Sequence, residues 1–121
     1  KRLRMACGVA IARGRVLLAR RAERGLFGGL WELPSVAVEG ASPRAALAAI
    51  GLRATGDEPL ASVRRTLTHR ELTLELYRCR TPRGALVGFI EQRFVARSEL
   101  AQLGISTAMA KGLAQVELLG G

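Results

Sequence analysis

The segment from Gly25 to Pro34 constrains the fold of this chain more than any other. It reads GLFGGLWELP, so three glycines stand close together before a Trp-Glu-Leu-Pro run. Glycines grouped in this way allow left-handed backbone and predict a tight loop, here over residues 22–29. The apolar run over residues 16–21 predicts the strand that enters this loop. Short extended pieces over 31–33 and 36–38 are expected to leave it, around the proline.

A short helix is predicted next, and its side chains limit its chemistry. Ser42 suits the N-cap position, Pro43 the first turn, and Gly51 the position after the last turn. Residues 43–50 contain alanines, one leucine, one isoleucine and Arg44, but no carboxylate. Magnesium is a hard cation that prefers oxygen ligands, usually carboxylates. This helix therefore cannot supply a magnesium site by itself.

The remaining pattern predicts an α+β fold with one mixed central β-sheet and flanking helices. Alternating apolar and polar residues indicate strands, and Arg13-Gly14-Arg15 is expected to be a tight turn with positive φ at the glycine. The expected strands cover residues 5–12, 16–21, 60–68, 71–80 and 89–95, and 60–80 form a β-hairpin. The expected helices are 43–50, a short helix opening at Ser98–Leu100, and a last helix that Ser106 or Thr107 caps and in which Met109, Leu113 and Val116 share one face.

The bulk composition fits one domain. The 121 residues are expected to form a single domain over 1–121, with residues 1–4 as the remnant of a linker. The hydrophobic content of 49% is too high for a disordered chain. No apolar run reaches the roughly 20 residues that cross a bilayer, and no signal peptide is visible. Cys7 and Cys79 match no metal or redox spacing, so they are interpreted as buried thiols in a reducing cytosol.

The chain carries a strong positive charge. The 19 Lys and Arg residues exceed the 10 Asp and Glu residues, which gives a formal net charge of +9. Such an excess favours a polyanionic partner, above all nucleic acid. A genome rich in G and C also produces an arginine- and alanine-rich chain without any function, so both interpretations stay open.

Three separated segments resemble one protein family. They are Val16–Pro34, Arg65–Glu75 and Gly104–Leu113. The first is similar to the turn before the catalytic helix of Nudix pyrophosphohydrolases, whose pattern is G-x5-E-x7-R-E-U-x-E-E-x-G-U; here the carboxylates of that helix are missing. The second contains the pattern T-[FL]-[ST]-H and the third S-T-x-M-x-K. Together they resemble the C-terminal, Nudix-like domain of MutY-type adenine DNA glycosylases over nearly the whole chain.

The resemblance implies a function in DNA base excision repair. MutY-type enzymes remove adenine mispaired with 8-oxoguanine. Their N-terminal domain carries the catalytic acids and an iron–sulfur cluster, and their C-terminal domain reads the oxidised guanine. We therefore expect a non-catalytic domain without a cofactor of its own, which binds double-stranded DNA containing 8-oxoguanine. The N-terminal glycosylase domain is expected as its partner in cis, and it alone would hold the iron–sulfur cluster. We expect a monomer in the bacterial cytoplasm, associated with the nucleoid and with no membrane.

The matching recognition loop is Leu67-Thr68-His69, where the family has F-S-H. Threonine keeps a hydroxyl that both donates and accepts, which suits 8-oxoguanine because its N7 carries a hydrogen where guanine has a lone pair. Leu67 keeps an apolar contact or wedge but loses aromatic stacking, which contributes about 1–3 kcal/mol per base. His69, the only histidine, is expected to brace the loop through a backbone contact. The structural alternative is a plain hairpin turn.

Basic residues near these segments are candidate phosphate contacts, which position a protein without reading sequence. Each of them can also be an ordinary solvated side chain. The candidates are Arg64, Arg65 and Arg70 beside the loop, Arg20, Arg21 and Arg24 before the glycines, and Lys111 on the last helix.

Two further functions stay open. An active Nudix hydrolase of nucleoside diphosphate derivatives would need metal carboxylates outside the usual helix, such as Glu32, Glu39, Glu71 or Glu91. Glu32 is better interpreted as a buried carboxylate bonded to backbone, and Trp31 as part of the core. A protein-interaction module on an inert Nudix scaffold is the third possibility, since fold alone does not decide function.

Overall fold

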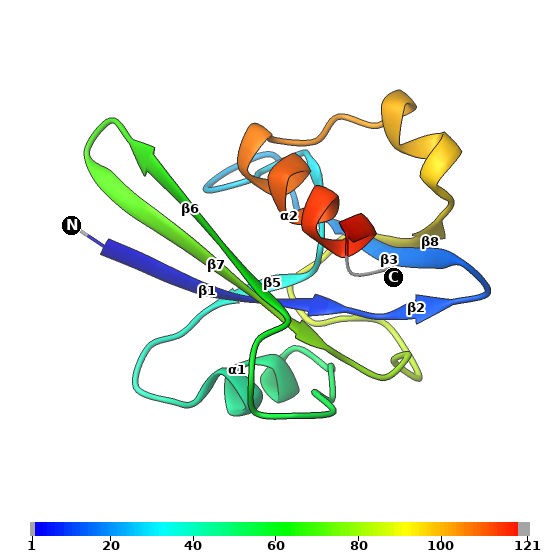
Figure 1. The fold of residues 1–121 in the computed structure, drawn as a ribbon, viewed down its shortest axis with the longest axis horizontal. Coiled ribbons are helices and arrows are strands. Elements are labelled where there is room, and N and C mark those ends of the chain that lie inside the picture. The colour runs from blue at the N-terminus through cyan, green and yellow to red at the C-terminus, as the bar shows by residue number, and fades with distance from the viewer. Residues whose placement is uncertain (1, 119–121) are drawn as a thin grey trace.

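A computed structural model describes residues 2–118, which form two four-stranded β-sheets with helical segments packed around them (Figure 1). The strands are β1 (Arg2–Val9), β2 (Ile11–Ala12), β3 (Arg15–Arg20), β4 (Trp31–Glu32), β5 (Ser35–Ala37), β6 (Ala61–Leu67), β7 (Arg70–Arg78) and β8 (Glu91–Val95). The helical segments are α1 (Pro43–Ala49), the 3₁₀ helix η1 (Arg97–Gln102) and α2 (Thr107–Leu118). The prediction of an α+β fold with a mixed sheet and flanking helices is confirmed.

The first sheet is mixed and has the strand order β5-β1-β7-β6. β1 pairs in parallel with β7 along its whole length, whereas β5 and β6 run antiparallel to their neighbours. The second sheet joins β3 to β2, β4 and β8, and all of its pairs are antiparallel. The hairpin expected at residues 60–80 is therefore present, but its second strand also holds the N-terminal strand.

Two sheets take the place of the one that was expected, because the stretch predicted as a single strand over 5–12 is divided at Ala10. Before the break, the Val9 carbonyl accepts a hydrogen bond from the Cys79 amide at 2.9 Å. After it, the Ala10 carbonyl accepts one from the Leu17 amide in β3, also at 2.9 Å. The chain thus changes its partner at Ala10 and passes from the first sheet into the second.

Residues 2–4 are the start of β1, not the remnant of a linker. They pair in register with β7, whose acidic side chains face them. Arg2 Nε lies 3.8 Å from Glu71 Oε1, and Arg4 Nε lies 2.6 Å from Glu75 Oε1. Arg2, Leu3 and Arg4 therefore belong to the strand, because their backbone pairs with β7.

The hydrophobic core lies on both faces of the first sheet. Successive residues of a strand point to opposite faces, so Met5 and Cys7 join one cluster and Ala6 joins the other. The first cluster includes the buried side of α2, and the second includes Leu47 of α1. Figure 1 shows these two helices on opposite sides of the sheet.

The last helix buries the face that was predicted. Met109, Leu113 and Val116 are all buried in α2, and Ser106, not Thr107, caps the helix: its Oγ accepts a hydrogen bond from the Met109 amide at 3.2 Å. No helix among residues 2–118 has the length and apolar character needed to cross a membrane.

The helix predicted at 43–50 is confirmed as α1, one residue shorter. Ser42 Oγ accepts a hydrogen bond from the Ala45 amide at 3.1 Å, and Gly51 follows the helix with a φ of +103°. Cys7 and Cys79 are buried and free, as the prediction of buried thiols requires.

Candidate nucleic-acid interface

The tip of the β6–β7 hairpin is a two-residue turn of Thr68 and His69, and Leu67 and Arg70 form the last strand pair before it. Neither turn residue has a positive φ, in contrast to Arg13 at +52° and Gly14 at +74° in the β2–β3 turn. Positive φ at both residues is what the common type I′ hairpin turn requires, so the Thr68–His69 turn is of another type.

Both side chains of this turn are exposed at the end of the ribbon. Within the described part of the chain, the His69 side chain makes no hydrogen bond, which corrects the expectation that it braces the loop. The turn is held by the Leu67–Arg70 strand pair instead. Thr68 and His69 are therefore available to a partner.

The register of the hairpin separates the three arginines that flank its tip. Arg65 pairs with Leu72, and Leu67 with Arg70, so these side chains share the face toward α2. Arg64 lies on the opposite face of β6. Arg65 and Arg70 thus belong to one surface, and Arg64 belongs to another.

A shallow pocket of about 340 Å³ lies at the base of this face. The loop after β3, the hairpin and the first turn of α2 meet around it, and Figure 1 shows that loop beside the start of the helix. These are the three segments that carry the family resemblance. The pocket is lined by Leu26, Phe27, Leu30, Arg65, Leu67, Leu72, Ser106, Thr107 and Ala108. Leu67 is half-buried and packs against the core beside this pocket, so it is not a free wedge.

The loop before β4 has a strained backbone where it lines the pocket. Phe27 has a φ of +62° although it is a bulky aromatic residue, and its side chain is buried. Such conformations persist only where packing enforces them, and they concentrate at functional sites. Gly28 is equally constrained, because a Cβ there would lie 2.4 Å from the Arg24 backbone nitrogen.

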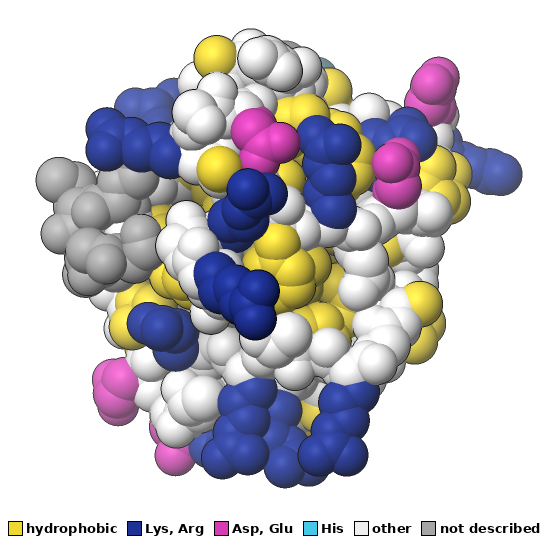
Figure 2. Space-filling model, turned by 90° about the vertical axis from the view of Figure 1, so that its right-hand side faces the viewer, with side chains coloured by type: hydrophobic (Ala, Val, Ile, Leu, Met, Phe, Trp, Pro, Cys, Tyr) yellow, Lys and Arg dark blue, Asp and Glu magenta, His cyan; other side chains and the backbone are white. Residues whose placement is uncertain are grey.

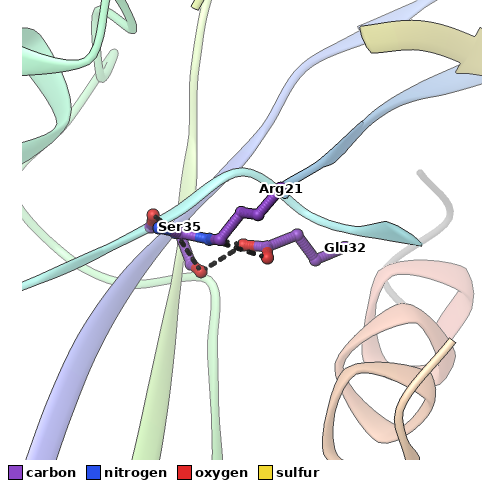
Figure 3. Close-up of polar contacts among 3 residues, drawn as sticks. All are labelled: Arg21, Glu32 and Ser35. Carbon is purple, nitrogen blue, oxygen red and sulfur yellow. Dashed lines mark hydrogen bonds and ion pairs between the residues drawn. The ribbon is translucent and has the colours of Figure 1, made fainter. Parts of the chain in front are cut away.

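A buried polar cluster anchors the base of this loop (Figure 3). The Glu32 carboxylate is fully buried, and Arg21 Nε donates to its Oε2 at 3.0 Å. Ser35 Oγ donates to Glu32 Oε1 at 2.5 Å, and the Arg21 guanidinium also donates to the Ser35 carbonyl. The partners of Glu32 are thus mainly side chains, and not the backbone alone as expected. The cluster ties the end of β3 to β4 and β5.

Burial has a direct effect on the charge of Glu32. It raises the pKa of the Glu32 carboxyl above its ordinary value, while the hydrogen bonds from Arg21 and Ser35 oppose part of that rise. The Arg21 guanidinium also lies over the Phe89 ring, 4.6 Å from its centroid. The Arg21 guanidinium is therefore occupied by contacts within the protein, with Glu32, Ser35 and Phe89.

The other predicted phosphate contacts lie in different settings. Arg20 forms an ion pair with Glu91 at 2.7 Å, and it does not line the pocket. Arg24 is exposed in the loop. Lys111 is exposed on α2, one turn after Thr107 and on the same side of the helix. The structure therefore places Arg65 in the pocket wall and Arg70 on the same face beside Leu67. Lys111 lies along the adjoining helix, and Arg20 and Arg21 have carboxylate partners.

The structure does not bring the four candidate metal carboxylates together. Glu71 and Glu91 form ion pairs with Arg2 and Arg20, Glu32 is held by Arg21, and Glu39 is exposed. Over residues 2–118, no group of three or more His, Cys, Asp or Glu side chains is placed to hold a metal ion.

Sequence reasoning missed the pocket and most of its lining. Leu26 and Leu30 gave no signal of their own, and Ser106 was recognised only as a possible helix cap, because their places in the pocket arise only when distant segments meet. The alternation of the hairpin did contain a usable signal, since it puts Arg65 and Leu67 on one face and Arg64 on the other.

The chain belongs to the Nudix domain family: residues 6–115 match the NUDIX domain. Its structure is similar to the solution structure of the E. coli ORF135 protein, with 24% identity and a TM-score of 0.77, covering 100% of this chain and 92% of that one. It is also similar to the MutT NUDIX hydrolase from Burkholderia pseudomallei, with 19% identity, a TM-score of 0.76, and coverage of 96% and 98%. At these identities the likeness shows the fold alone.

A third solved structure is the complex between the C-terminal domain of mouse MUTYH and human PCNA. That domain is 27% identical to this chain, with a TM-score of 0.69 and coverage of 97% of this chain and 88% of the other. No curated protein matches the chain. The neighbours thus include both hydrolases and a C-terminal domain of the MutY type.

Proposed function

We propose that this domain recognises 8-oxoguanine in double-stranded DNA as the non-catalytic C-terminal part of a MutY-type adenine DNA glycosylase. One observation carries the proposal: the three segments that resemble that family converge on one pocket beside the hairpin tip. The likeness to the mouse MUTYH C-terminal domain supports it further.

The exposed tip supplies the chemistry of recognition. The Thr68 hydroxyl accepts a hydrogen bond from N7–H of 8-oxoguanine, an interaction that guanine cannot offer. Because a hydroxyl rotates and can also donate to guanine N7, its discrimination is modest, about tenfold or less for one hydrogen bond. Leu67 supports the turn from below by packing at the pocket.

The basic side chains supply docking without sequence preference. Arg65 and Arg70 lie on the face of the tip, and Lys111 lies on the adjoining helix, where each can contact a phosphate. The bound domain would raise the effective concentration of the glycosylase domain at the opposite adenine.

A variant pair tests this role of the tip. Thr68→Ala removes the hydroxyl, and Thr66→Ala removes an equivalent hydroxyl from the opposite face of β6. We expect Thr68→Ala to abolish the preference for 8-oxoguanine over guanine duplexes in fluorescence anisotropy, and Thr66→Ala to retain it. If the two variants showed the same preference for 8-oxoguanine over guanine, the Thr68 hydroxyl would not be the group that reads the lesion.

A second candidate function is hydrolysis of nucleoside diphosphate derivatives. The observation in its favour is that the chain belongs to the Nudix domain family and has a NUDIX hydrolase among its structural neighbours. The dispersed carboxylates disfavour it, because magnesium sites need converging oxygen ligands. Magnesium-dependent release of phosphate or pyrophosphate from such substrates, lost in Glu39→Gln or Glu71→Gln, would establish hydrolysis.

A further inference from the structure

A second pocket, of about 360 Å³, is lined by Gly51, Arg53, Arg80, Thr81, Pro82 and Arg83. It lies where the chain leaves α1 and where it leaves β7. The hairpin tip is at the other end of β7, so the two sites are at opposite ends of this strand (Figure 1). The second pocket therefore shares no residue with the proposed lesion site.

Backbone pairing holds two of the three arginines beside each other. The Arg80 amide donates to the Arg53 carbonyl at 3.0 Å, and Ala54 forms a β-bridge with Cys79. The Thr55 amide extends this pairing by donating to the Arg78 carbonyl at 2.9 Å. The positions of these arginines are thus imposed by the fold.

Nothing in the described part of the chain neutralises this group. The ion pairs within residues 2–118 involve other arginines, and none includes Arg53, Arg80 or Arg83. These side chains do not cap α1 either, because the Leu47 and Ala48 carbonyls already accept hydrogen bonds from backbone amides of residues 50–52. Like charges held together repel, and a bound anion would relieve that repulsion.

Basic side chains are also present on the open surface. Figure 2 shows a face on which Lys and Arg side chains lie apart from one another over much of the surface, with hydrophobic side chains exposed between them, and with a closer group of basic side chains at its lower edge. A pocket with three arginines in its wall is a more specific arrangement than a generally positive surface.

We propose that the Arg53–Arg80–Arg83 pocket is a phosphate-binding site. A guanidinium presents a planar fork of N–H groups that matches phosphate oxygens, and the Thr81 hydroxyl adds a further donor. The volume is at the lower end of the range of small-ligand sites, about 300–1,000 Å³, and so suits one phosphate or a short polyphosphate.

The phosphate can belong to a DNA backbone or to a free nucleotide or polyphosphate. The distance from the pocket to the hairpin tip allows an experiment to distinguish these two sources. The nine residues of β7 span about 30 Å at about 3.3 Å per residue. This is close to one turn of B-DNA, about 34–36 Å. A duplex of one turn or more that is bound at the tip can therefore reach the pocket with its backbone, whereas a duplex much shorter than one turn cannot. A free nucleotide or polyphosphate needs no contact with the tip.

The test compares two double variants with the same loss of charge. Arg80→Gln/Arg83→Gln removes two arginines of the pocket, and Arg13→Gln/Arg15→Gln removes two exposed arginines at the β2–β3 turn. Each is titrated with inorganic tripolyphosphate by calorimetry, and by fluorescence anisotropy with undamaged duplexes of about 6 base pairs, closed by a loop, and about 25 base pairs. Circular dichroism verifies that both variants are folded.

We expect the pocket variant to lose about tenfold or more in affinity for one of these probes, with the control close to wild type. Loss for tripolyphosphate identifies a free phosphate ligand, and loss for the long duplex alone identifies the DNA backbone. Equal behaviour of both variants with every probe overturns the proposal. Lesion preference is a separate readout: if it is absent while the pocket variant still differs from the control, the proposed function fails and the phosphate site stands.

Discussion

At the scale of single residues, Glu32 stands out because it is an acidic side chain in the protein interior. It is fully buried, and the Arg21–Ser35 cluster compensates only part of the cost of burying its charge. Its pKa is raised in the folded protein, so the folded state holds the proton more tightly than the unfolded state does. Stability therefore falls as the pH rises from the unfolded pKa through the folded pKa.

Glu32→Gln removes this titration and keeps the shape of the side chain. At low pH both side chains are neutral, so we expect the free energy of unfolding of the wild type, relative to that of the variant, to be highest there. This difference should fall as the pH rises and the Glu32 carboxyl ionises. Urea unfolding at about pH 4 and about pH 8 measures the difference, with Glu39→Gln as a control at an exposed carboxylate. A wild-type advantage that grows with pH would mean that Arg21 outweighs burial.

At the scale of elements, the loop between β3 and β4 shapes the pocket through its backbone. Gly28→Ala would place a methyl group 2.4 Å from the Arg24 nitrogen, so we expect a loss of about 2–3 kcal/mol in the free energy of unfolding, together with weaker DNA binding. Gly56→Ala is the matched control, because a Cβ there meets open space, and it should stay within about 0.5 kcal/mol. Chemical denaturation of both variants decides, and an unchanged Gly28→Ala would contradict this account.

Local elements were predictable from the sequence because their signals are local. Ser42 and Pro43 marked the start of α1, and alternation marked the hairpin strands, as the structure confirms. The division at Ala10 was missed, since it depends on β1 pairing with a strand about seventy residues later. The partners of Glu32 were missed for the same reason: Arg21 comes near it only when β3 and β4 pair.

At the scale of the whole molecule, the net charge of +9 divides into paired and unpaired arginines. Arg20 is neutralised by Glu91, whereas the described ion pairs leave Arg65 and Arg70 without a carboxylate. Each phosphate contact contributes about 0.9 to the slope of log affinity against log salt. We expect Arg65→Gln/Arg70→Gln to reduce that slope by about 1.8, and Arg20→Gln to leave it nearly unchanged. If Arg20→Gln reduced the slope more than Arg65→Gln/Arg70→Gln did, the DNA would bind over the second sheet, which contains β3.

The central claim is that the domain reads an oxidised base. Fluorescence-anisotropy titration of the wild-type chain with two matched duplexes tests it most directly, one with 8-oxoguanine opposite adenine and one with guanine in its place. We expect the oxidised duplex to bind more tightly, by up to about tenfold. Equal affinity for the two duplexes would contradict it and would leave a basic Nudix domain that binds DNA without reading the lesion.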